Sequence, residues 1–442
     1  MNKESVLNIG FDDTDSPTGM CTTFLAYKIV DLLQKQKTEF LDFPKLIRFN
    51  PNIPWKTRGN GAVSLKIKTK NPSKIKNQIK NLVSKYSDTK NGANPGLVFF
   101  ESNSIPSEFT KFSNLALWQL INRNSAKKFA KKNKLDFFYE GNGQGLVGAI
   151  SAIGYDFHDH TLELLSYRKK RKFGKERKIS VDSVKKMQEK TFPYTFNSFD
   201  TKKGRVLITP HGPDPVFYGV RGENVDSLVN ATKILKSNEK LDGYMIFKSN
   251  QGTGDHLKNE LNFETMKPYA SGTLSGIVSN IPKIVKGGHV FFTIISKNHE
   301  FWCAVYKETG ISTIASNLII GDEISIGGGV RKASKNFPRI INLEFIEIIH
   351  LKKNLSKSNP MCKKCSKKMK SKGQNQGFQC IRCGKKSSNK ITVEIPRKVK
   401  KQLYIPKISA HRHLTRPLQR TGIINKTSKF DESLSWFCVY RN

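Results

Sequence analysis

Apolar and polar positions alternate with two different periods along the first part of the chain. An apolar run that ends at Phe11 predicts a strand, and residues 24–33 repeat apolar side chains at helical spacing. The stretch 62–67 then alternates as a strand does, and 97–100 is an apolar run that follows a Pro-Gly turn. We therefore predict an α/β domain at residues 1–125.

A second alternation of strands and helices occupies residues 126–260. A glycine-rich turn precedes the small, helix-prone residues 146–153, and the apolar runs 161–167 and 205–208 read as strands. Two helical stretches among alternating strands are typical of a ferredoxin-like α+β layer, which we predict for this domain.

Short strands recur from about residue 270 to residue 352, where the pattern becomes all-β. The gap at 309–318 has room for a helix. The runs that predict strands are 272–278, 288–295, 302–306, 323–326 and 340–349. Five strands with a helix between the third and the fourth form the pattern of an OB-fold barrel, which we place at 268–352.

Aromatic side chains in this predicted barrel are candidates for stacking on nucleic-acid bases. They are Phe291, Phe292, Trp302 and Tyr306. Because side chains alternate along a strand, we expect about half of them to point into the barrel.

Two Cys-x-x-Cys pairs are the strongest metal signal in the sequence. Cys362 and Cys365 form the first pair and Cys380 and Cys383 the second, with fourteen residues between them. Four thiolates complete the tetrahedral shell of a structural Zn²⁺, although a ribbon without metal is the alternative. We predict a zinc ribbon at 358–390 and a basic C-terminal segment at 391–442.

The charge of the chain is extreme, with 76 Lys+Arg against 36 Asp+Glu and a formal net charge of +40 over 442 residues. An excess of this size indicates a polyanionic partner, and nucleic acid is the interpretation we prefer to a merely lysine-rich, solvated surface. The sequence has no apolar run of about 20 residues and no signal-peptide core. The scattered remaining cysteines are typical of a reducing compartment, so we expect a cytoplasmic protein without membrane contact.

Three carboxylates follow the first predicted strand, namely Asp12, Asp13 and Asp15. A Pro/Gly turn comes next, and Thr22 and Thr23 open the predicted helix. Carboxylates gathered in this way favour a bound Mg²⁺, and a helix N-terminus favours a phosphate group. Ordinary turn and capping chemistry is the alternative. From the residues alone, either threonine could be a cap or a reacting group.

A basic loop precedes the predicted strand at 62–67 and is a candidate for phosphate contact. It consists of Lys56, Thr57, Arg58, Gly59, Asn60 and Gly61. A basic hairpin turn is the alternative, and the loop is not a Walker A motif. The later Gly143–Gly148 segment matches GxGxxG, but we interpret it as a helix packed closely on a sheet rather than as a dinucleotide site.

Several motifs together resemble the TiaS family, the archaeal 2-agmatinylcytidine synthetases of the minor isoleucine tRNA that reads AUA. The resemblance covers nearly the whole chain. The matching segments are 10–16 with 19–23, 48–51 with 56–63, 145–149, 218–223, 287–292, the four cysteines and 410–414.

The resemblance implies a multidomain α/β plus β fold whose N-terminal domain is an ATP-binding, kinase-like catalytic domain. It implies ATP-dependent ligation of agmatine to C2 of the wobble cytidine of the CAU anticodon, with ATP converted to AMP and two phosphates. Thr22 would be self-phosphorylated. Asp12, Asp13 and Asp15 would hold Mg²⁺ and ATP, and Lys56 to Gly61 would contact the phosphates.

Other roles stay open at this level. Asp12 and Asp13 are candidates for a general base, and the agmatine dication needs a carboxylate. The candidates for that carboxylate are Glu140, Glu163, Asp214 and Glu223. The tRNA anticodon loop and stem are the expected partner, and no obligate protein partner is evident. The alternative function is an OB-fold and zinc-ribbon nucleic-acid-binding protein without catalysis.

Overall fold

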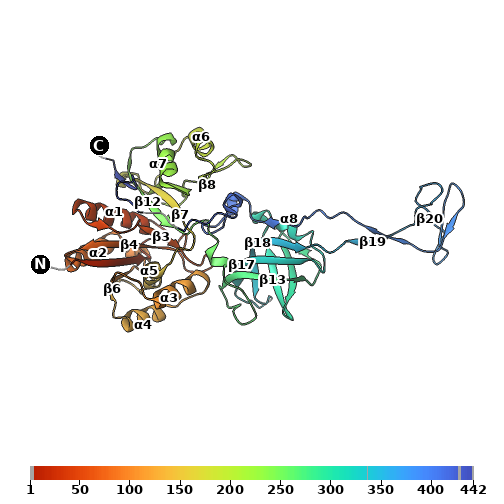
Figure 1. Ribbon diagram of the computed structural model, residues 1–442, viewed down its shortest axis with the longest axis horizontal. Coiled ribbons are helices and arrows are strands. Elements are labelled where there is room, and N and C mark those ends of the chain that lie inside the picture. Colours follow the sequence, from red (N-terminus) through yellow and green to blue (C-terminus); the bar gives the residue numbers. More distant parts are fainter. Residues whose placement is uncertain (1–3, 336, 427–429, 441–442) are drawn as a thin grey trace. The chain divides into compact units, whose positions relative to one another are not determined.

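The computed structural model describes residues 4–335, 337–426 and 430–440, and the chain divides into two compact units (Figure 1). Unit 1 comprises Met1–Thr273, Gly327–Arg339 and Ile405–Asn442. Unit 2 comprises Leu274–Ile326 and Ile340–Tyr404. Unit 2 is thus inserted in the sequence of unit 1.

Among the described residues of unit 1, eleven strands form a single sheet in the order β6-β5-β1-β4-β3-β12-β7-β11-β8, with β2 beside β4 and β25 beside β12. The strands are β1 (Ser5–Asp12), β2 (Glu39–Phe40), β3 (Lys45–Arg48), β4 (Gly61–Thr69), β5 (Gly96–Glu101), β6 (Asp136–Tyr139), β7 (Thr161–Arg168), β8 (Thr195–Phe196), β11 (Val216–Gly222), β12 (Leu241–Ser249) and β25 (Phe437–Val439). β9 (Phe199–Asp200) and β10 (Arg205–Val206) form a separate pair.

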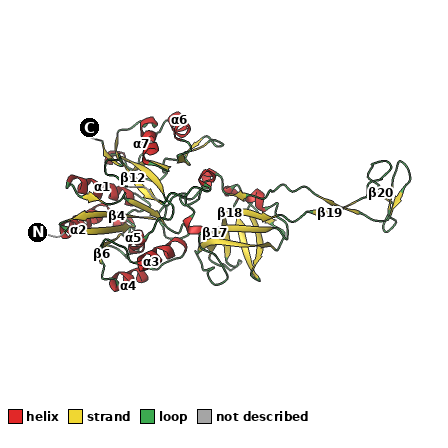
Figure 2. Cartoon of the chain, in the orientation of Figure 1, coloured by secondary structure: helices red, strands yellow, loops and turns green. Residues whose placement is uncertain are grey.

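Helices cover both faces of this sheet (Figure 2). They are α1 (Thr22–Lys35), α2 (Pro72–Tyr86), α3 (Ser107–Trp118), α4 (Arg123–Lys132), α5 (Gly145–Gly154), α6 (Val181–Thr191) and α7 (Val225–Ile234). Leu7, Ile9 and Phe11 of β1 are fully buried in the core that α1, α2, α6 and α7 share. The opposite face of the sheet, at Val98, packs on α3, α4 and α5.

The two α/β regions expected at 1–125 and 126–260 contribute to the same sheet. β6 pairs with β5, and α5 packs on β1. β3 and β12 pair in parallel, with Lys248 opposite Lys45, and thereby join the two halves. The predicted helix 146–153 is confirmed as α5. Of the expected strand 205–208, only Arg205–Val206 form a strand.

The end of the chain is part of this core. β25 pairs with β12, where Val439 lies opposite Gly243, and the nearby Trp436 is 1% exposed. The stretch 391–442, predicted as one basic segment, is thus divided between the units: its residues up to Tyr404 belong to unit 2, and the described residues 405–426 and 430–440 belong to unit 1. The final residues, 441 and 442, which we expected to be poorly ordered, lie outside the described residues.

Among the described residues, five strands form a closed barrel that belongs mainly to unit 2. They are β13 (Ser271–Val278), β15 (Val290–Ser296), β16 (His299–Val305), β17 (Glu323–Arg331) and β18 (Ile340–His350). The sheet closes because β13 pairs with both β17 and β15. α8 (Ser312–Ala315) lies between the third and the fourth barrel strand, as predicted.

Short strands extend this unit beyond the barrel. β14 (Lys283–Ile284) pairs with β15, and β24 (Leu403–Tyr404) pairs with β18. β19 (Leu355–Ser358) and β23 (Ile391–Glu394) form a two-stranded connection to a small sheet of β20 (Lys370–Ser371), β21 (Phe378–Gln379) and β22 (Lys386–Ser387). None of the helices in the described ranges has the length and the apolar composition needed to cross a bilayer.

Candidate active site

The acidic turn begins where β1 ends. Asp12 closes the strand, and Asp13 adopts a left-handed backbone with φ 57° that Asp tolerates better than most residues. The amide of Asp13 donates a hydrogen bond of 2.7 Å to Oδ1 of Asp12. Strand end and turn thus hold the carboxylates of this segment close together.

The electrostatics of the turn favour a cation. Burial, followed by the charge of Asp13, raises the pKa of Asp12 well above its usual value. Burial and the charge of Asp15 raise the pKa of Asp13 to about 7. Burial also raises the pKa of Asp15, although the neighbouring Arg58 opposes this effect. Carboxylates that repel one another in this way are suited to hard cations such as Mg²⁺.

Glycines of α5 allow this helix to lie directly on the acidic turn. A Cβ added at Gly148 would overlap the carboxylate of Asp12, and one added at Gly145 would overlap the backbone of Gly96. Gly10 of β1 meets the backbone of Ala149 in the same manner. The interpretation of the GxGxxG segment as a closely packed helix start is confirmed.

The basic loop lies against the acidic turn. Nη2 of Arg58 is 2.6 Å from Oδ2 of Asp15 and donates a second bond of 2.6 Å to the carbonyl of Met20. The side-chain amide of Asn60 donates to the carbonyl of Asn50 at 2.9 Å, which anchors the other side of the loop. The sequence-predicted nucleotide residues thus come together around one cavity.

We call this the nucleotide cavity. Its lining includes Asp12, Asp13, Asp15, Lys56, Thr57, Arg58, Gly59, Asn60, Gly61, Gln144 and Gly148. Every residue predicted to contact ATP is among them.

Thr22 lines a neighbouring cavity, which we call the threonine cavity. Asp15, Arg58, Gly59 and Gly61 line both cavities. Thr22 is the first residue of α1, is 5% exposed, and its hydroxyl accepts a 3.1 Å hydrogen bond from Thr14. The side chain of Thr22 is therefore placed beside the nucleotide cavity.

Two of the four candidate agmatine carboxylates line the threonine cavity, namely Glu163 and Asp214. The other two are engaged elsewhere. Glu140 accepts a hydrogen bond from Ser84, and Glu223 pairs with Arg420, whose side chain is 1% exposed.

The two carboxylates of the threonine cavity differ in their partners. Glu163 lies 3.3 Å from Nε of Arg221 and 3.8 Å from Nη2 of Arg48, and Gln251 also donates to it. Oδ1 of Asp214 accepts a hydrogen bond of 3.0 Å from the amide of Val216 and lies 3.4 Å from Nη2 of Arg177, whereas Oδ2 has a loose contact of 3.8 Å with Nη1 of Arg58. Burial raises the pKa of Asp214, although the positive charges of Arg177 and Arg58 act in the opposite direction.

The guanidinium of Arg177 holds the loop that carries Asp214. Nε donates to the carbonyl of Val216 at 2.7 Å, and Nη1 donates to Pro210 at 3.0 Å and to Gly212 at 2.8 Å. Nη2 donates to the carbonyl of Asp214 at 2.7 Å. One side chain therefore fixes four backbone carbonyls of a turn-rich loop.

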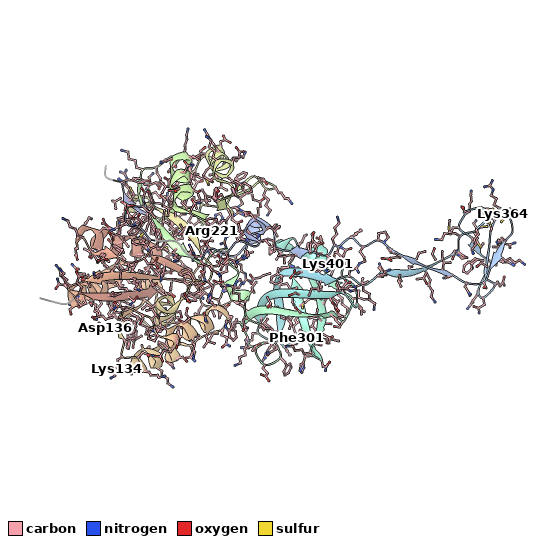
Figure 3. All side chains as sticks on the ribbon, viewed as in Figure 1. Lys134, Asp136, Arg221, Phe301, Lys364 and Lys401 are labelled. Atoms are coloured by element: carbon pink, nitrogen blue, oxygen red, sulfur yellow. The ribbon has the colours of Figure 1, made fainter. Side chains whose placement is uncertain are left out.

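Sequence reasoning missed the basic residues of the threonine cavity as individual site residues. They are Arg48, Arg221 (labelled in Figure 3) and His413. Nδ1 of His413 lies 2.9 Å from Nη2 of Arg221, and burial, with the charges of Arg48 and Arg221, lowers the pKa of His413 well below its usual value. The signal that could have found them is their position within the segments 48–51, 218–223 and 410–414.

The four cysteines of unit 2 form one cluster. The sulfurs of Cys362, Cys365, Cys380 and Cys383 all lie within 4.8 Å of one another. Backbone amides of Cys383 and Arg382 lower the pKa of Cys380 to about 6, which favours a thiolate. Four sulfurs at these distances fit the shell of a tetrahedral metal.

The aromatic side chains of the barrel are divided between its two faces. Phe292 is 0% exposed and points into the core. Phe291 and Trp302 are partly exposed, and Trp302 pairs with Thr293, which shares the strand face of Phe291. Tyr306 is also partly exposed, so one of the four aromatic residues is buried instead of the expected half.

Known proteins match the chain along most of its length. Family models match as the TiaS TCKD domain over residues 8–71, the TiaS FLD domain over 143–256 and the TiaS C-terminal zinc ribbon domain over 359–399. The isoleucine tRNA 2-agmatinylcytidine synthetase TiaS of Cenarchaeum symbiosum is 46% identical over 434 residues, which are 98% of this chain and 97% of that protein.

Solved structures agree with these matches. A complex of TiaS with its isoleucine tRNA and ATP superposes with a TM-score of 0.84 at 33% identity, and a complex with the tRNA, AMPCPP and agmatine superposes with 0.82 at 31%. Each comparison covers 94% of this chain and 97% of the other. Sequence identity to TiaS proteins extends along nearly the whole chain, and the acidic turn, the threonine cavity and the cysteine cluster lie within the matched region. The chain therefore belongs to the TiaS family.

Proposed function

We propose that this chain uses ATP to join agmatine to C2 of the wobble cytidine in the minor isoleucine tRNA. The family is named for this reaction, and a relative has been solved with its tRNA, AMPCPP and agmatine together. The observation that carries the proposal is the pair of adjoining cavities. One gathers the acidic turn and the basic loop, and the other holds Thr22 and two carboxylates.

The chemistry requires activation of the cytidine. The C2 oxygen is a poor leaving group, and phosphorylation converts it into a good one. The amine nitrogen of agmatine then forms a bond to C2 and loses its proton, while the C2 oxygen departs with the phosphoryl group as phosphate. Positioning and charge stabilisation supply most of the rate enhancement of such a transfer. Two phosphoryl groups leave ATP in all: one departs from C2 as phosphate, and the other would be carried by Thr22 and released to water, so that ATP ends as AMP and two phosphates.

Asp12, Asp13 and Asp15 would hold Mg²⁺, which neutralises phosphate charge when bound. Lys56 to Gly61 would contact the phosphates of ATP from the other side of the nucleotide cavity. Arg58 now binds Asp15 and borders both cavities, so it is placed to contact a phosphoryl group that passes between them. Thr22, at the border, is the threonine that we expect to become phosphorylated.

Asp214 is the carboxylate that we assign to agmatine. Both carboxylates face two arginines, but both oxygens of Glu163 are engaged, Oε1 by Arg221 and Oε2 by Gln251 and Arg48. Oδ2 of Asp214 is more weakly engaged and lines the same cavity as Thr22. A dicationic substrate is stabilised there by a partly desolvated negative charge.

The barrel and the cysteine ribbon would bind the tRNA. The pattern of five strands with one short helix supports an OB-fold, and the four cysteines would hold a structural Zn²⁺. Phe291 and Trp302 share the outer face and are the aromatic residues we expect to contact bases. Free cysteines and a tRNA substrate support a cytoplasmic location.

The test is incubation with ATP, Mg²⁺, labelled agmatine and transcripts that carry C or U at the wobble position. Label that enters the cytidine transcript alone, and only with ATP, is the expected result. Tight, salt-dependent RNA binding without label would instead favour a nucleic-acid-binding protein without catalysis.

A further inference from the structure

A third cavity of unit 1, which we call the arginine cavity, is lined by basic side chains from separate segments. They come from β3, from the basic loop, from β11 and from the returning C-terminal segment. The basic residues are Arg48, Lys56, Arg58, Arg221, His411, Arg412 and His413. The described lining residues include no carboxylate.

These positive charges lie close enough to oppose one another. Burial, and then the charge of Arg412, lowers the pKa of Lys56. Burial and the charge of Arg221 lower the pKa of His411 in the same way. Within the described chain, Nε of Arg48 is buried without a hydrogen-bond partner. A cavity with such a lining has a strongly positive potential, which an anion would relieve.

The carboxylates near these residues are directed to the threonine cavity. Glu163 faces Arg221 and Arg48, and Asp15 binds Arg58. On the side of the arginine cavity, Lys56 donates to the carbonyl of Ile53 at 3.2 Å, and Arg412 donates to Oδ1 of Asn52 at 2.7 Å. These contacts through neutral oxygens hold both cations in place beside the cavity.

The arginine and threonine cavities share a border formed by Arg48, Arg58, Gly59, Arg221 and His413. A Cβ at Gly59 would collide with the ring of His413, so the basic loop and the C-terminal segment pack directly on each other. A nucleotide whose base enters the threonine cavity carries its own phosphates, and the neighbouring cavity offers charges of the opposite sign.

We propose that the arginine cavity binds a phosphate group, with Arg412 as its principal ligand from the C-terminal segment. The RNA phosphodiester beside the modified cytidine is one source of this group, and that identification rests on the proposed function. Inorganic phosphate released from ATP is the other source. Guanidinium groups suit both, because they donate two parallel hydrogen bonds to phosphate oxygens.

The experiment compares the full-length protein with Arg412→Gln and Arg412→Lys. The dissociation constant of the minor isoleucine tRNA is measured over a series of salt concentrations. We expect Arg412→Gln to weaken binding about tenfold and to reduce the slope of log K against log salt by about 0.7–0.9, the value for one phosphate contact. Arg412→Lys keeps the charge but not the paired donors, so it should keep the salt slope of the parent and lose only part of the affinity.

Lys35→Gln is the matched control, since it removes one charge at the far end of α1, where Lys35 pairs with Asp31. Thermal unfolding of each variant shows whether the fold is retained. Titration calorimetry with inorganic phosphate forms the second arm of the experiment.

The outcomes separate the two sources. Weaker tRNA binding with a lower salt slope identifies the RNA phosphodiester, whereas loss of phosphate binding with unchanged tRNA affinity identifies free phosphate. If Arg412→Gln changes neither, the inference is overturned. Agmatine transfer by the unmodified protein is assayed in parallel, so that failure of the proposed function is recognised separately.

Discussion

At the scale of single residues, Thr22 lines the threonine cavity, which adjoins the nucleotide cavity at Arg58. It begins α1 and is almost fully buried, yet its hydroxyl borders a cavity that shares Arg58 with the nucleotide cavity. Thr23 is its neighbour in sequence, and its hydroxyl lies 3.0 Å from the sulfur of Cys21. The structure therefore gives the two threonines different partners, a distinction that the sequence pattern does not make.

Thr22→Ala should abolish agmatine transfer, a loss of at least about 10³-fold if the hydroxyl carries a phosphoryl group. Binding of tRNA should persist, because the change removes no charge. Transfer of labelled agmatine and a filter-binding assay measure the two effects. Thr22→Ser and Thr23→Ala are the matched variants and should both retain transfer. Full transfer by Thr22→Ala would exclude a role for this hydroxyl.

His413 makes stability depend on pH. Its pKa in the folded protein is lowered well below 6.5 by burial and by Arg48 and Arg221, so the unfolded chain binds a proton more readily. The folded state therefore loses stability as the pH falls below about 6.5, the pKa of an unperturbed histidine, and it regains that stability above this value.

We expect the free energy of unfolding of the parent to fall more steeply between about pH 7 and pH 5 than that of His413→Gln, because the unfolded chain takes up a proton over this interval that the folded protein does not. Urea denaturation at a series of pH values measures the difference. The difference between the two proteins isolates His413 from the other titrating groups. Parallel curves for both proteins would contradict this account.

At the scale of elements, the Asp214 loop depends on a side chain far from it in sequence. Four of its carbonyls accept hydrogen bonds from the one guanidinium of Arg177. The loop is rich in proline and glycine and forms no strand before β11. The hydrogen bonds from Arg177 therefore hold its backbone in place of the hydrogen-bond ladder of a β-sheet. The position of Asp214 is thereby linked to Arg177.

Arg177→Lys keeps a positive charge but cannot reach four carbonyls from one point. We expect the KM for agmatine to rise at least about tenfold, since one misplaced charged contact costs more than about 1.4 kcal/mol. The KM for ATP should change little. Steady-state kinetics with each substrate varied in turn measures the KM for agmatine and the KM for ATP separately.

Arg171→Lys, on the exposed turn Lys170–Lys172, is the matched control and should leave both constants unchanged. Asp214→Asn should raise the agmatine KM in the same direction as Arg177→Lys. An equal rise in the KM for agmatine and in the KM for ATP would indicate that unit 1 is loosened as a whole, and not that Arg177 positions the loop.

Local patterns were sufficient for many of these elements. β1 and α1 follow from apolar periodicity, and the cysteine ligands follow from two short spacings. Pairing between distant segments was not predictable, because β3 meets β12 and β12 meets β25 through contacts that leave no periodic signal nearby. The role of Arg177 was missed for the same reason, since its partners lie more than thirty residues away. The parts of the candidate site that were predictable are those whose residues follow one another in the sequence, namely the acidic turn and the basic loop.

At the scale of the molecule, the two units separate the cavities from the cysteine cluster. The nucleotide and threonine cavities are lined by unit 1, whereas Cys362, Cys365, Cys380 and Cys383 belong to unit 2. A substitution at the cysteine cluster therefore removes no residue that lines these two cavities.

The purified protein should contain one Zn²⁺ per chain by metal analysis. Cys380→Ser should lower the zinc content and weaken tRNA binding by about tenfold or more, because a ribbon without metal loses most of its folding free energy. The KM for ATP should remain near that of the parent. Cys438→Ser is the matched control, since Cys438 lies in β25 of unit 1. A metal-free protein with a folded ribbon would contradict the assignment.

The return of the chain to unit 1 affects the order in which the protein is completed during synthesis. Unit 1 is begun by the first strand and is finished by β25, and the arginine cavity requires residues 411–414. A ribosome must therefore translate the whole of unit 2 before the threonine and arginine cavities are fully lined. A chain that stops after the barrel and ribbon lacks His413 and the strand that pairs with β12. The topology thus ties the lining of these two cavities to translation of the C-terminal segment.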